Sequence, residues 1–210
     1  MQGLILAAGM GKRLKELTQD NTKCMVKVNG VRLIERALDQ LAKIGLARTI
    51  LVIGYQGAKL KKFVGRSWKG MRIEYVNNLI YNKTNNIYSL ALAADKLAAD
   101  DTILMESDLI IEDEVLKKVV KDPHPNVAVV DAFQSWMDGT CVTLDENNLI
   151  KRFVPKKDFI YEEIPSYYKT VNIYKFSKGF SKNDYVPFLK AYSKALGDNE
   201  YYEQVLRVIT

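Results

Sequence analysis

Short apolar runs alternate with amphipathic stretches along the first two thirds of the chain. The apolar runs predict strands at 3–8, 49–54, 71–77, 102–110 and 126–133. Apolar residues at helical spacing predict helices at 31–45, 57–65, 87–98 and 112–121. Because a helix follows each of the first four strands, the pattern predicts an α/β fold with a mainly parallel sheet and helices on both faces.

The pattern changes after residue 140. Residues 140–154 alternate around a turn and predict a hairpin, and 167–176 predicts one more strand. Two helices are expected at 181–196 and 199–209. No linker composition divides the chain, so we expect one Rossmann-like domain over 1–210, with the hairpin as a small annex at the sheet edge.

Charge is distributed unevenly along this chain of net charge +6. Residues 1–65 hold 12 Lys and Arg against 4 Asp and Glu. Such an excess favours an anionic partner. The basic residues are scattered among apolar ones rather than gathered in an arm, so we expect a small polyanion such as a nucleoside triphosphate and no nucleic acid.

Other classes of protein are disfavoured by what the chain contains. No apolar run has transmembrane length, and Lys12 and Arg13 interrupt the opening stretch too early for a signal peptide. We therefore expect a cytoplasmic protein without a membrane span. Cys24 and Cys141 match no metal or disulfide spacing. The single histidine, His124, lies in a turn composition and is expected at the surface.

A glycine loop follows the first predicted strand. In "LILAAGMGKRL", Gly9 and Gly11 allow backbone N–H groups to approach an oxyanion. The dinucleotide-binding fingerprint needs a third glycine where Leu14 stands, which argues against a dinucleotide-dependent oxidoreductase. The spacing to Lys12 also fails the Walker A pattern.

A longer stretch resembles a known family. "LAAGMGKRLKELTQDNTKCMVKVNGVRLI" resembles the two-part signature of the nucleotidyltransferases, which transfer a nucleoside monophosphate from a triphosphate to a phosphorylated acceptor. The resemblance implies the nucleotidyltransferase fold, with the base and ribose along Ala7 to Gly9, the β- and γ-phosphates on Gly9 to Gly11 with Arg13, and the α-phosphate at Lys23. The whole nucleotide-binding set is then Leu6, Ala7, Ala8, Gly9, Met10, Gly11, Lys12, Arg13, Lys23, Asn86 and Ser89. Thr22 departs from the family, which has proline there.

The same resemblance implies a Mg²⁺ ion held by Asp108 in "ILMESDLII". The alternative is that Glu106 and Asp108 simply begin a helix. Arg13, Lys23 and Asp108 are the expected catalytic residues. The family's second metal-binding acid lies in a C-terminal segment that this chain lacks, so we expect the chain to be a fragment of a longer or fused protein. A fusion partner or a homodimer stays open.

The segment "TNNIYSLALA" at 84–93 resembles cytidylyltransferases that act on phosphocholine and on 2-aminoethylphosphonate. Asn85 or Asn86 is expected to cap the helix. Asn86 is equally expected to contact the cytosine base, and Ser89 is expected to contact it. CTP is therefore the expected nucleotide. A sugar-1-phosphate nucleotidyltransferase is a weaker alternative, as is a regulatory nucleotide-binding domain without turnover.

The expected acceptor is 2-aminoethylphosphonate, with phosphocholine as the alternative. Lys169 and Asn172 in "TVNIYKF" are candidates for its anionic group, and Asp131, or else Asp138, for its ammonium group. A quaternary ammonium would instead need an aromatic cage. The candidates for that cage are Trp136, Tyr168 and Tyr174.

Overall fold

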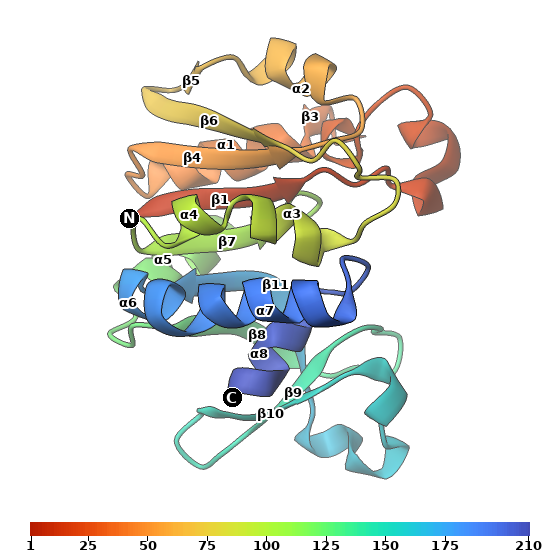
Figure 1. The fold of residues 1–210 in the computed structure, drawn as a ribbon, viewed down its shortest axis with the longest axis vertical. Helices are drawn as coiled ribbons and strands as arrows, with labels where there is room; N and C mark the ends of the chain where they lie inside the picture. Colours follow the sequence, from red (N-terminus) through yellow and green to blue (C-terminus); the bar gives the residue numbers. More distant parts are fainter.

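The computed structural model describes residues 1–210, and four parallel strands form its centre (Figure 1). In spatial order they are β6 (Met71–Asn77), β4 (Arg48–Ile53), β1 (Gln2–Ala7) and β7 (Thr102–Glu106). Every residue of β1 is buried. The carboxyl ends of all four strands meet at one edge of the sheet, where ligands bind in folds of this kind.

The sheet continues through β11 (Tyr168–Phe176), which pairs antiparallel with β7. One edge of β11 pairs with β8 (Val127–Ala132). Along its other edge, the start of β11 pairs with β9 (Cys141–Leu144) and its end pairs with β7. Near this change of partner Asn172 has a left-handed φ of 59°, and the pairing with β8 shifts register. The bulge lets one strand serve both the central sheet and the annex.

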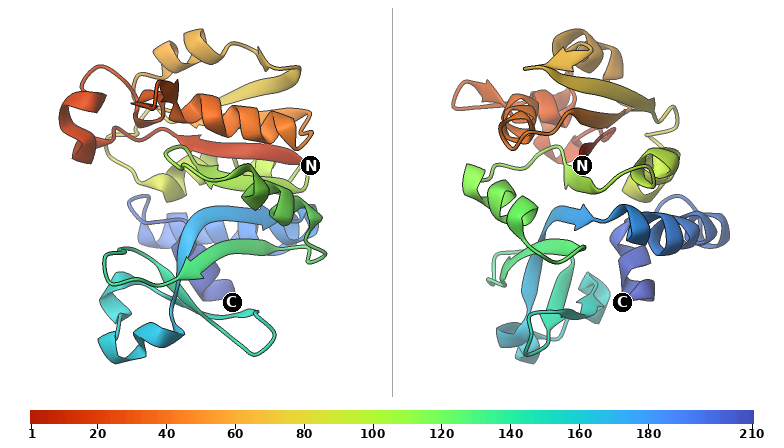
Figure 2. Two further views of the ribbon diagram at one scale, coloured as in Figure 1. Left: turned by 180° about the vertical axis from the view of Figure 1, so that it is seen from behind. Right: turned by 90° about the vertical axis from the view of Figure 1, so that its left-hand side faces the viewer.

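Helices cover both faces of the sheet (Figure 2). One face carries α1 (Leu33–Lys43), α2 (Gly57–Val64) and α5 (Asp113–Lys121). The other carries α3 (Asn86–Leu92), α4 (Ala94–Leu97), α7 (Val186–Leu196) and α8 (Glu203–Ile209). Alternate residues of β1 supply the two cores, since Leu4 and Leu6 belong to one and Ile5 and Ala7 to the other. Burial on both faces explains the unbroken apolar runs in the sequence.

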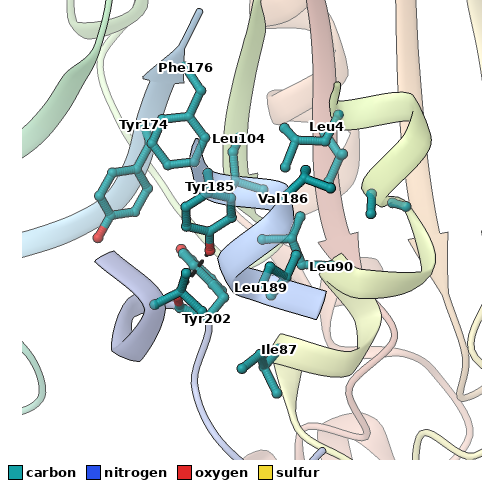
Figure 3. Close-up of a cluster of buried hydrophobic side chains, with 14 of the residues drawn as sticks. Leu4, Ile87, Leu90, Leu104, Tyr174, Phe176, Tyr185, Val186, Leu189 and Tyr202 are labelled. Carbon is teal, nitrogen blue, oxygen red and sulfur yellow. Dashed lines mark hydrogen bonds between the residues drawn. The ribbon is translucent and has the colours of Figure 1, made fainter. Parts of the chain in front are cut away.

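Aromatic side chains fix the C-terminal helices against the sheet (Figure 3). The rings of Tyr174 and Tyr202 lie 5.9 Å apart in an edge-to-face arrangement, and those of Phe176 and Tyr185 lie 5.1 Å apart. The Tyr185 hydroxyl donates to the backbone carbonyl of Tyr202. These contacts hold the start of α8 beside β11.

The annex is a hairpin of β9 and β10 (Ile150–Val154) with its own small core. That core consists of Cys141, Val154 and Tyr167. The remaining short elements are η1 (Lys12–Thr18), η2 (Lys23–Met25), β2 (Lys27–Val28), β3 (Val31–Arg32), β5 (Ser67–Trp68), η3 (Lys156–Asp158), η4 (Tyr161–Ser166), α6 (Lys178–Phe180) and η5 (Ser181–Tyr185).

The predicted fold class is confirmed: an α/β sheet with a parallel centre, helices on both faces and a hairpin annex. None of its helices has both the length and the apolar character needed to cross a membrane.

Three element boundaries differ from the sequence prediction. The strand predicted at 102–110 ends at Glu106, because the next residues turn away and form the loop that carries Asp108. The helix predicted at 87–98 is broken at Ala93, whose ψ is 8°. The final helix begins at Glu203, four residues later than predicted.

Candidate active site

A cleft of about 1140 Å³ opens at the carboxyl ends of the parallel strands. Its walls come from the glycine loop after β1, the start of α3, the turn after β7, the annex and α8. The sequence-predicted site residues that line it are Leu6, Ala8, Gly9, Gly11, Lys12, Arg13, Lys23, Asn86, Ser89, Asp108, Lys169 and Asn172. The fold thus gathers residues that were predicted from five separate parts of the chain.

Three of the predicted site residues lie outside the lining of this cleft. The side chain of Ala7 is buried in the core beneath α1, and Met10 is exposed on the loop. Asp131, a candidate for the acceptor's ammonium group, does not line this cleft either. It lies on β8, along the edge of β11 opposite β7, and its carboxylate accepts the N–H of Ala132 at 2.8 Å.

The glycine loop is shaped by close packing at Gly11. This residue has a left-handed φ of 63°, and a Cβ built there would lie 3.0 Å from both Lys23 Cβ and Thr18 Cγ2. Glycine is required because any other residue would be strained and would displace the lysine. The next two side chains, Lys12 and Arg13, are exposed and form no ion pair. Two free cations therefore stand at the mouth of the cleft.

Lys23 and Asp108 form an ion pair across the cleft, although 85 residues separate them in the chain. Lys23 begins the short helix η2, and the residue before it, Thr22, has φ −67° and ψ 151°. Proline is fixed near this φ. Thr22 therefore adopts the backbone that the family's proline imposes, and the lysine keeps its direction. Asp108 comes from the turn after β7, and its side chain is 28% exposed.

A second carboxylate, Glu106, lies at the end of β7 and also lines the cleft. Burial raises the pKa of Glu106 to about 7, and the neighbouring charge of Asp108 adds to the rise. A hydrogen bond from Asn86 Nδ2 to Glu106 Oε1, 3.0 Å long, partly opposes it. The sequence analysis considered Glu106 only as the start of a helix. Its place at the end of a buried strand, two residues before Asp108, was the available signal.

Asn86 links the end of β7 to the C-terminal segment. Its amide nitrogen donates to Glu106, and its amide oxygen accepts the N–H of Tyr202 at 3.0 Å. The helix α3 is capped by Asn85, whose side chain accepts the N–H of Asn86. The capping role considered for Asn86 therefore belongs to its neighbour. A contact between Asn86 and the base stays a prediction.

Ser89 is buried and is held by a residue that the sequence analysis did not single out. Asn78 Nδ2 donates to Ser89 Oγ and to Thr84 Oγ1, both at 3.1 Å. All three residues line the cleft near Leu6 and Ala8. The Ser89 hydroxyl acts as an acceptor here, and its own proton remains free to donate.

Lys169 and Asn172 place polar groups on the annex side of the cleft. Lys169 Nζ donates to the Thr170 carbonyl at 2.7 Å and makes no ion pair. Asn172 is the bulge residue of β11, and the Thr170 hydroxyl lies 3.3 Å from its side-chain oxygen. The bulge turns these side chains toward the cleft at the point where β11 leaves the central sheet.

The aromatic cage considered for a quaternary ammonium is not assembled. Trp136, Tyr168 and Tyr174 do not line the cleft. Trp136 is 79% exposed, and Tyr174 is buried with its hydroxyl bonded to Glu203. Asp138 does line the cleft, but it is exposed and pairs with Lys156 at 3.1 Å.

Glu203 is the residue that the sequence analysis missed entirely. It begins α8, is 9% exposed and lines the cleft opposite the glycine loop. Its Oε1 accepts hydrogen bonds from Thr170 Oγ1 at 3.0 Å and from the Tyr174 hydroxyl at 2.5 Å. The only local signal was an acid at the start of a helix, which carries no functional meaning by itself.

The cleft thus has two chemically different ends. Lys12, Arg13 and Lys23 supply cations beside a glycine loop, which suits a chain of phosphates. Asp108 and Glu106 add two carboxylates to the same cleft, and carboxylate oxygens suit a hard divalent cation. The far end combines Lys169 with an acidic group from α8 and therefore suits an acceptor with charges of both signs.

Gly9→Ala is expected to weaken nucleotide binding without lowering the stability of the fold. A Cβ on Gly9 meets no atom within 4 Å, so the melting temperature should stay within a degree or two of the wild type. The methyl group would occupy the cleft where phosphates approach the backbone, so KM for the nucleotide should rise about tenfold or more. Gly179→Ala is the matched control, because its Cβ also meets nothing within 4 Å but lies in α6. An unchanged KM in the Gly9 variant would show that the loop does not hold the nucleotide.

Comparison with known proteins gives a family match and several relatives. Residues 3–149 match the family model of the MobA-like NTP transferase domain. The CMP-5'-(3-aminopropyl)phosphonate synthase of Streptomyces rubellomurinus is 28% identical over 97% of this chain. The 2-aminoethylphosphonate cytidylyltransferase of Lancefieldella rimae is 34% identical over 53% of this chain. The chain spans 32% of the first relative's length, and the second match spans 44% of that relative.

A solved structure shows the same fold at low sequence identity. The inositol-1-phosphate CTP transferase from T. maritima superposes with a TM-score of 0.73 at 21% identity. The superposition covers 99% of this chain and 80% of that one. The likeness extends over β10 and the C-terminal helices, which lie beyond residues 3–149 of the family match.

Proposed function

The chain belongs to the family of MobA-like NTP transferase domains, and on this premise we propose that it is a cytidylyltransferase that transfers CMP from CTP to 2-aminoethylphosphonate. The products are CMP-2-aminoethylphosphonate and pyrophosphate. The phosphonate relatives support this choice of acceptor class. Because the chain covers less than half of those relatives, the activity is proposed for this domain.

One observation carries the proposal. The glycine loop, Lys23 and Asp108 converge in a single cleft that also contains Lys169 at its far end. A triphosphate laid along the loop would place its α-phosphate near Lys23. An anionic acceptor held by Lys169 would then face that phosphorus from the opposite side. This is the arrangement that in-line displacement requires.

The reaction needs no general base. A phosphonate oxygen, already anionic at neutral pH, attacks the α-phosphorus. The bond from that phosphorus to the bridging oxygen of the β-phosphate breaks, and its electron pair leaves with pyrophosphate. Lys12 and Arg13 bind the β- and γ-phosphates, while Lys23 exchanges Asp108 for an oxygen of the α-phosphate. The chain contributes positioning and charge neutralisation, which account for most of the catalysis in phosphoryl transfer.

The acidic residues fit a bound Mg²⁺ ion. Asp108 is partly exposed to the cleft, and Glu106 lies two residues before it with its carboxylate in the same wall. Carboxylates together with phosphate oxygens are the ligands that Mg²⁺ prefers. When bound, the ion would neutralise charge on the α-phosphate and the departing pyrophosphate. Asp108 would hold it, and the release of Asp108 would free Lys23 for the nucleotide.

The proposed nucleotide is CTP, and its kcat/KM is expected to exceed that of UTP, ATP and GTP by about tenfold or more. The polar groups of Asn78, Thr84 and Ser89 line the wall where the base would lie. A base with the wrong pattern of donors and acceptors would leave such groups unpaired, which costs about 1–3 kcal/mol. Pyrophosphate release, measured with each triphosphate at a fixed acceptor concentration, tests this. Equal kcat/KM for UTP would contradict it.

The acceptor is tested in the same assay with 2-aminoethylphosphonate, phosphocholine and glucose 1-phosphate. The aminophosphonate should give the highest kcat/KM. Phosphocholine is the alternative, and its quaternary ammonium would need aromatic faces. Tyr192 and Tyr201 line the cleft, and Tyr81 does so beside Tyr55 at a ring distance of 6.0 Å. An enzyme that uses phosphocholine at least as efficiently as the aminophosphonate would overturn the proposed acceptor.

A further inference from the structure

Glu203 places a carboxylate in the wall of the cleft without a directly bonded cation. It is nearly buried, and no lysine or arginine pairs with it. Its two hydrogen-bond donors, Thr170 and Tyr174, are neutral hydroxyls that both bind Oε1. Burying a carboxylate without a cation is costly. Such a group at the wall of a cleft is typical of a site that receives its cation from a ligand.

The second oxygen of this carboxylate is available to a ligand. Oε2 of Glu203 accepts no hydrogen bond within the protein, yet it is not among the side-chain oxygens sealed from solvent. Because Glu203 lines the cleft, the free oxygen is reached from there. The two hydroxyls hold Oε1 and thereby fix the orientation of the whole carboxylate group.

The neighbouring groups also respond to an uncompensated negative charge. Burial raises the pKa of the Tyr174 and Tyr185 phenols well above the ordinary value, and the charge of Glu203 raises both further. The same charge contributes to the raised pKa of Glu106, after burial and Asp108. Three neighbouring side chains thus lie within the field of the Glu203 carboxylate, toward which a cationic ligand would be attracted.

A cation of the protein lies close by, on the far side of Thr170. The Thr170 hydroxyl is 3.0 Å from Glu203 Oε1 and 3.4 Å from Lys169 Nζ. Glu203 Oε1 and Lys169 Nζ are therefore separated by no more than the sum of these two distances. Both residues line the cleft. One positive and one negative group at this separation match a small zwitterion whose charges are joined by a short carbon chain.

We propose that Glu203 binds the ammonium group of the acceptor while Lys169 binds its phosphonate group. This inference rests on the proposed function and names the residue that selects an amino-bearing acceptor within it. A primary ammonium fits better than a quaternary one, because the free carboxylate oxygen accepts an N–H and Tyr174 offers its hydroxyl to Glu203 rather than its ring face to the cleft.

A purely structural role for Glu203 makes a different prediction. An acid in the first turn of a helix is stabilised by the helix dipole. If that were its only role, removing the charge would lower stability and leave acceptor selection unchanged. Glu203→Gln separates the two roles, because the amide oxygen still accepts the bonds from Thr170 and Tyr174 while the charge is lost.

The experiment compares 2-aminoethylphosphonate with ethylphosphonate, which lacks the amine. In the wild type, KM should be about ten- to a hundredfold lower for the aminophosphonate, the scale of one charged hydrogen bond. In Glu203→Gln the two acceptors should have similar KM, while KM for CTP and the melting temperature stay close to the wild type. The matched control is Glu200→Gln, since Glu200 is exposed on the rim of the same cleft and should change neither KM.

Calorimetric binding of the two phosphonates to wild type and variant, without CTP, makes the result independent of turnover. Loss of the amine preference in Glu203→Gln supports the inference. A preference that survives in this variant overturns it, even if turnover proceeds as proposed. The preference seen in binding without any CMP transfer would contradict the proposed function alone. An aminophosphonate that does not bind the wild type would overturn both.

Discussion

Replacing Lys23 with alanine is expected to lower kcat about 100- to 1000-fold. The lysine lies between the glycine loop and Asp108, where its charge would be closest to the α-phosphate at which bonds form and break. Removing one preorganised group of this kind usually has an effect of that size, because its interaction strengthens as charge develops in the transition state. Arg13→Ala should show a loss of similar scale. Pyrophosphate release under saturating CTP and acceptor measures both.

The matched control is Lys27→Ala. Lys27 follows four residues later, is exposed in the short strand β2 and does not line the cleft. Its loss removes the same charge from the same basic half of the chain without touching the site, so kcat should be nearly unchanged. If the Lys23 and Arg13 variants both kept wild-type rates, the assignment of the phosphate site to this loop would be wrong.

The residues proposed to hold the phosphates could be predicted from the sequence, because each lies in a short recognisable motif. The glycine loop, Lys23 and Asp108 each follow a recognisable element, and the carboxyl ends of parallel strands meet at one edge. Thr22 stands where the family has proline, but its backbone adopts the angles that proline would impose, so the direction of Lys23 is kept. The residues that the family resemblance implied for the phosphates and the metal therefore lie in one cleft, and their roles stay predictions.

The side of the cleft formed by β11 and α8 was predicted only in part, because it depends on contacts across long sequence distances. Glu203 acquires its setting from Thr170 and Tyr174, which are 33 and 29 residues away. The bulge at Asn172 decides which side chains of β11 face the cleft, and no residue pattern announces a left-handed asparagine within a strand. Asp131 was chosen from its place at a strand end, but β8 pairs with the edge of β11 opposite β7.

Helix boundaries failed for a related reason. The backbone N–H of Asn85, the cap of α3, donates to the Asp198 carbonyl. The N–H of Ile87, in the first turn of α3, donates to the Glu200 carbonyl. Asn86 also accepts the N–H of Tyr202. The segment before α8 is thus non-helical, and its carbonyls accept hydrogen bonds from the start of another helix. Local propensity predicted helix there, and these tertiary hydrogen bonds prevailed.

Removing the divalent cation is expected to abolish activity, and Asp108→Asn is expected to lower kcat by about 1000-fold or more. The asparagine keeps the size of the side chain but loses the charge that would hold Mg²⁺ against the phosphates. It also removes the ionic partner of Lys23. The two roles are separable, because an Asp108 that merely positioned Lys23 would leave the apparent affinity for Mg²⁺ unchanged in the variant. If Asp108 is a metal ligand, the Mg²⁺ concentration at half-maximal activity should rise at least tenfold.

Titration of Mg²⁺ into chelator-treated enzyme, followed by pyrophosphate release, gives both quantities. Glu112→Gln is the control, since Glu112 is exposed in the same loop and forms no ion pair, and it should behave as the wild type. Full activity in excess chelator would exclude a metal requirement. A fully active Asp108→Asn enzyme with an unchanged Mg²⁺ dependence would move the metal to another ligand. Glu106 would be the first carboxylate to examine, because it lies two residues before Asp108 in the same cleft.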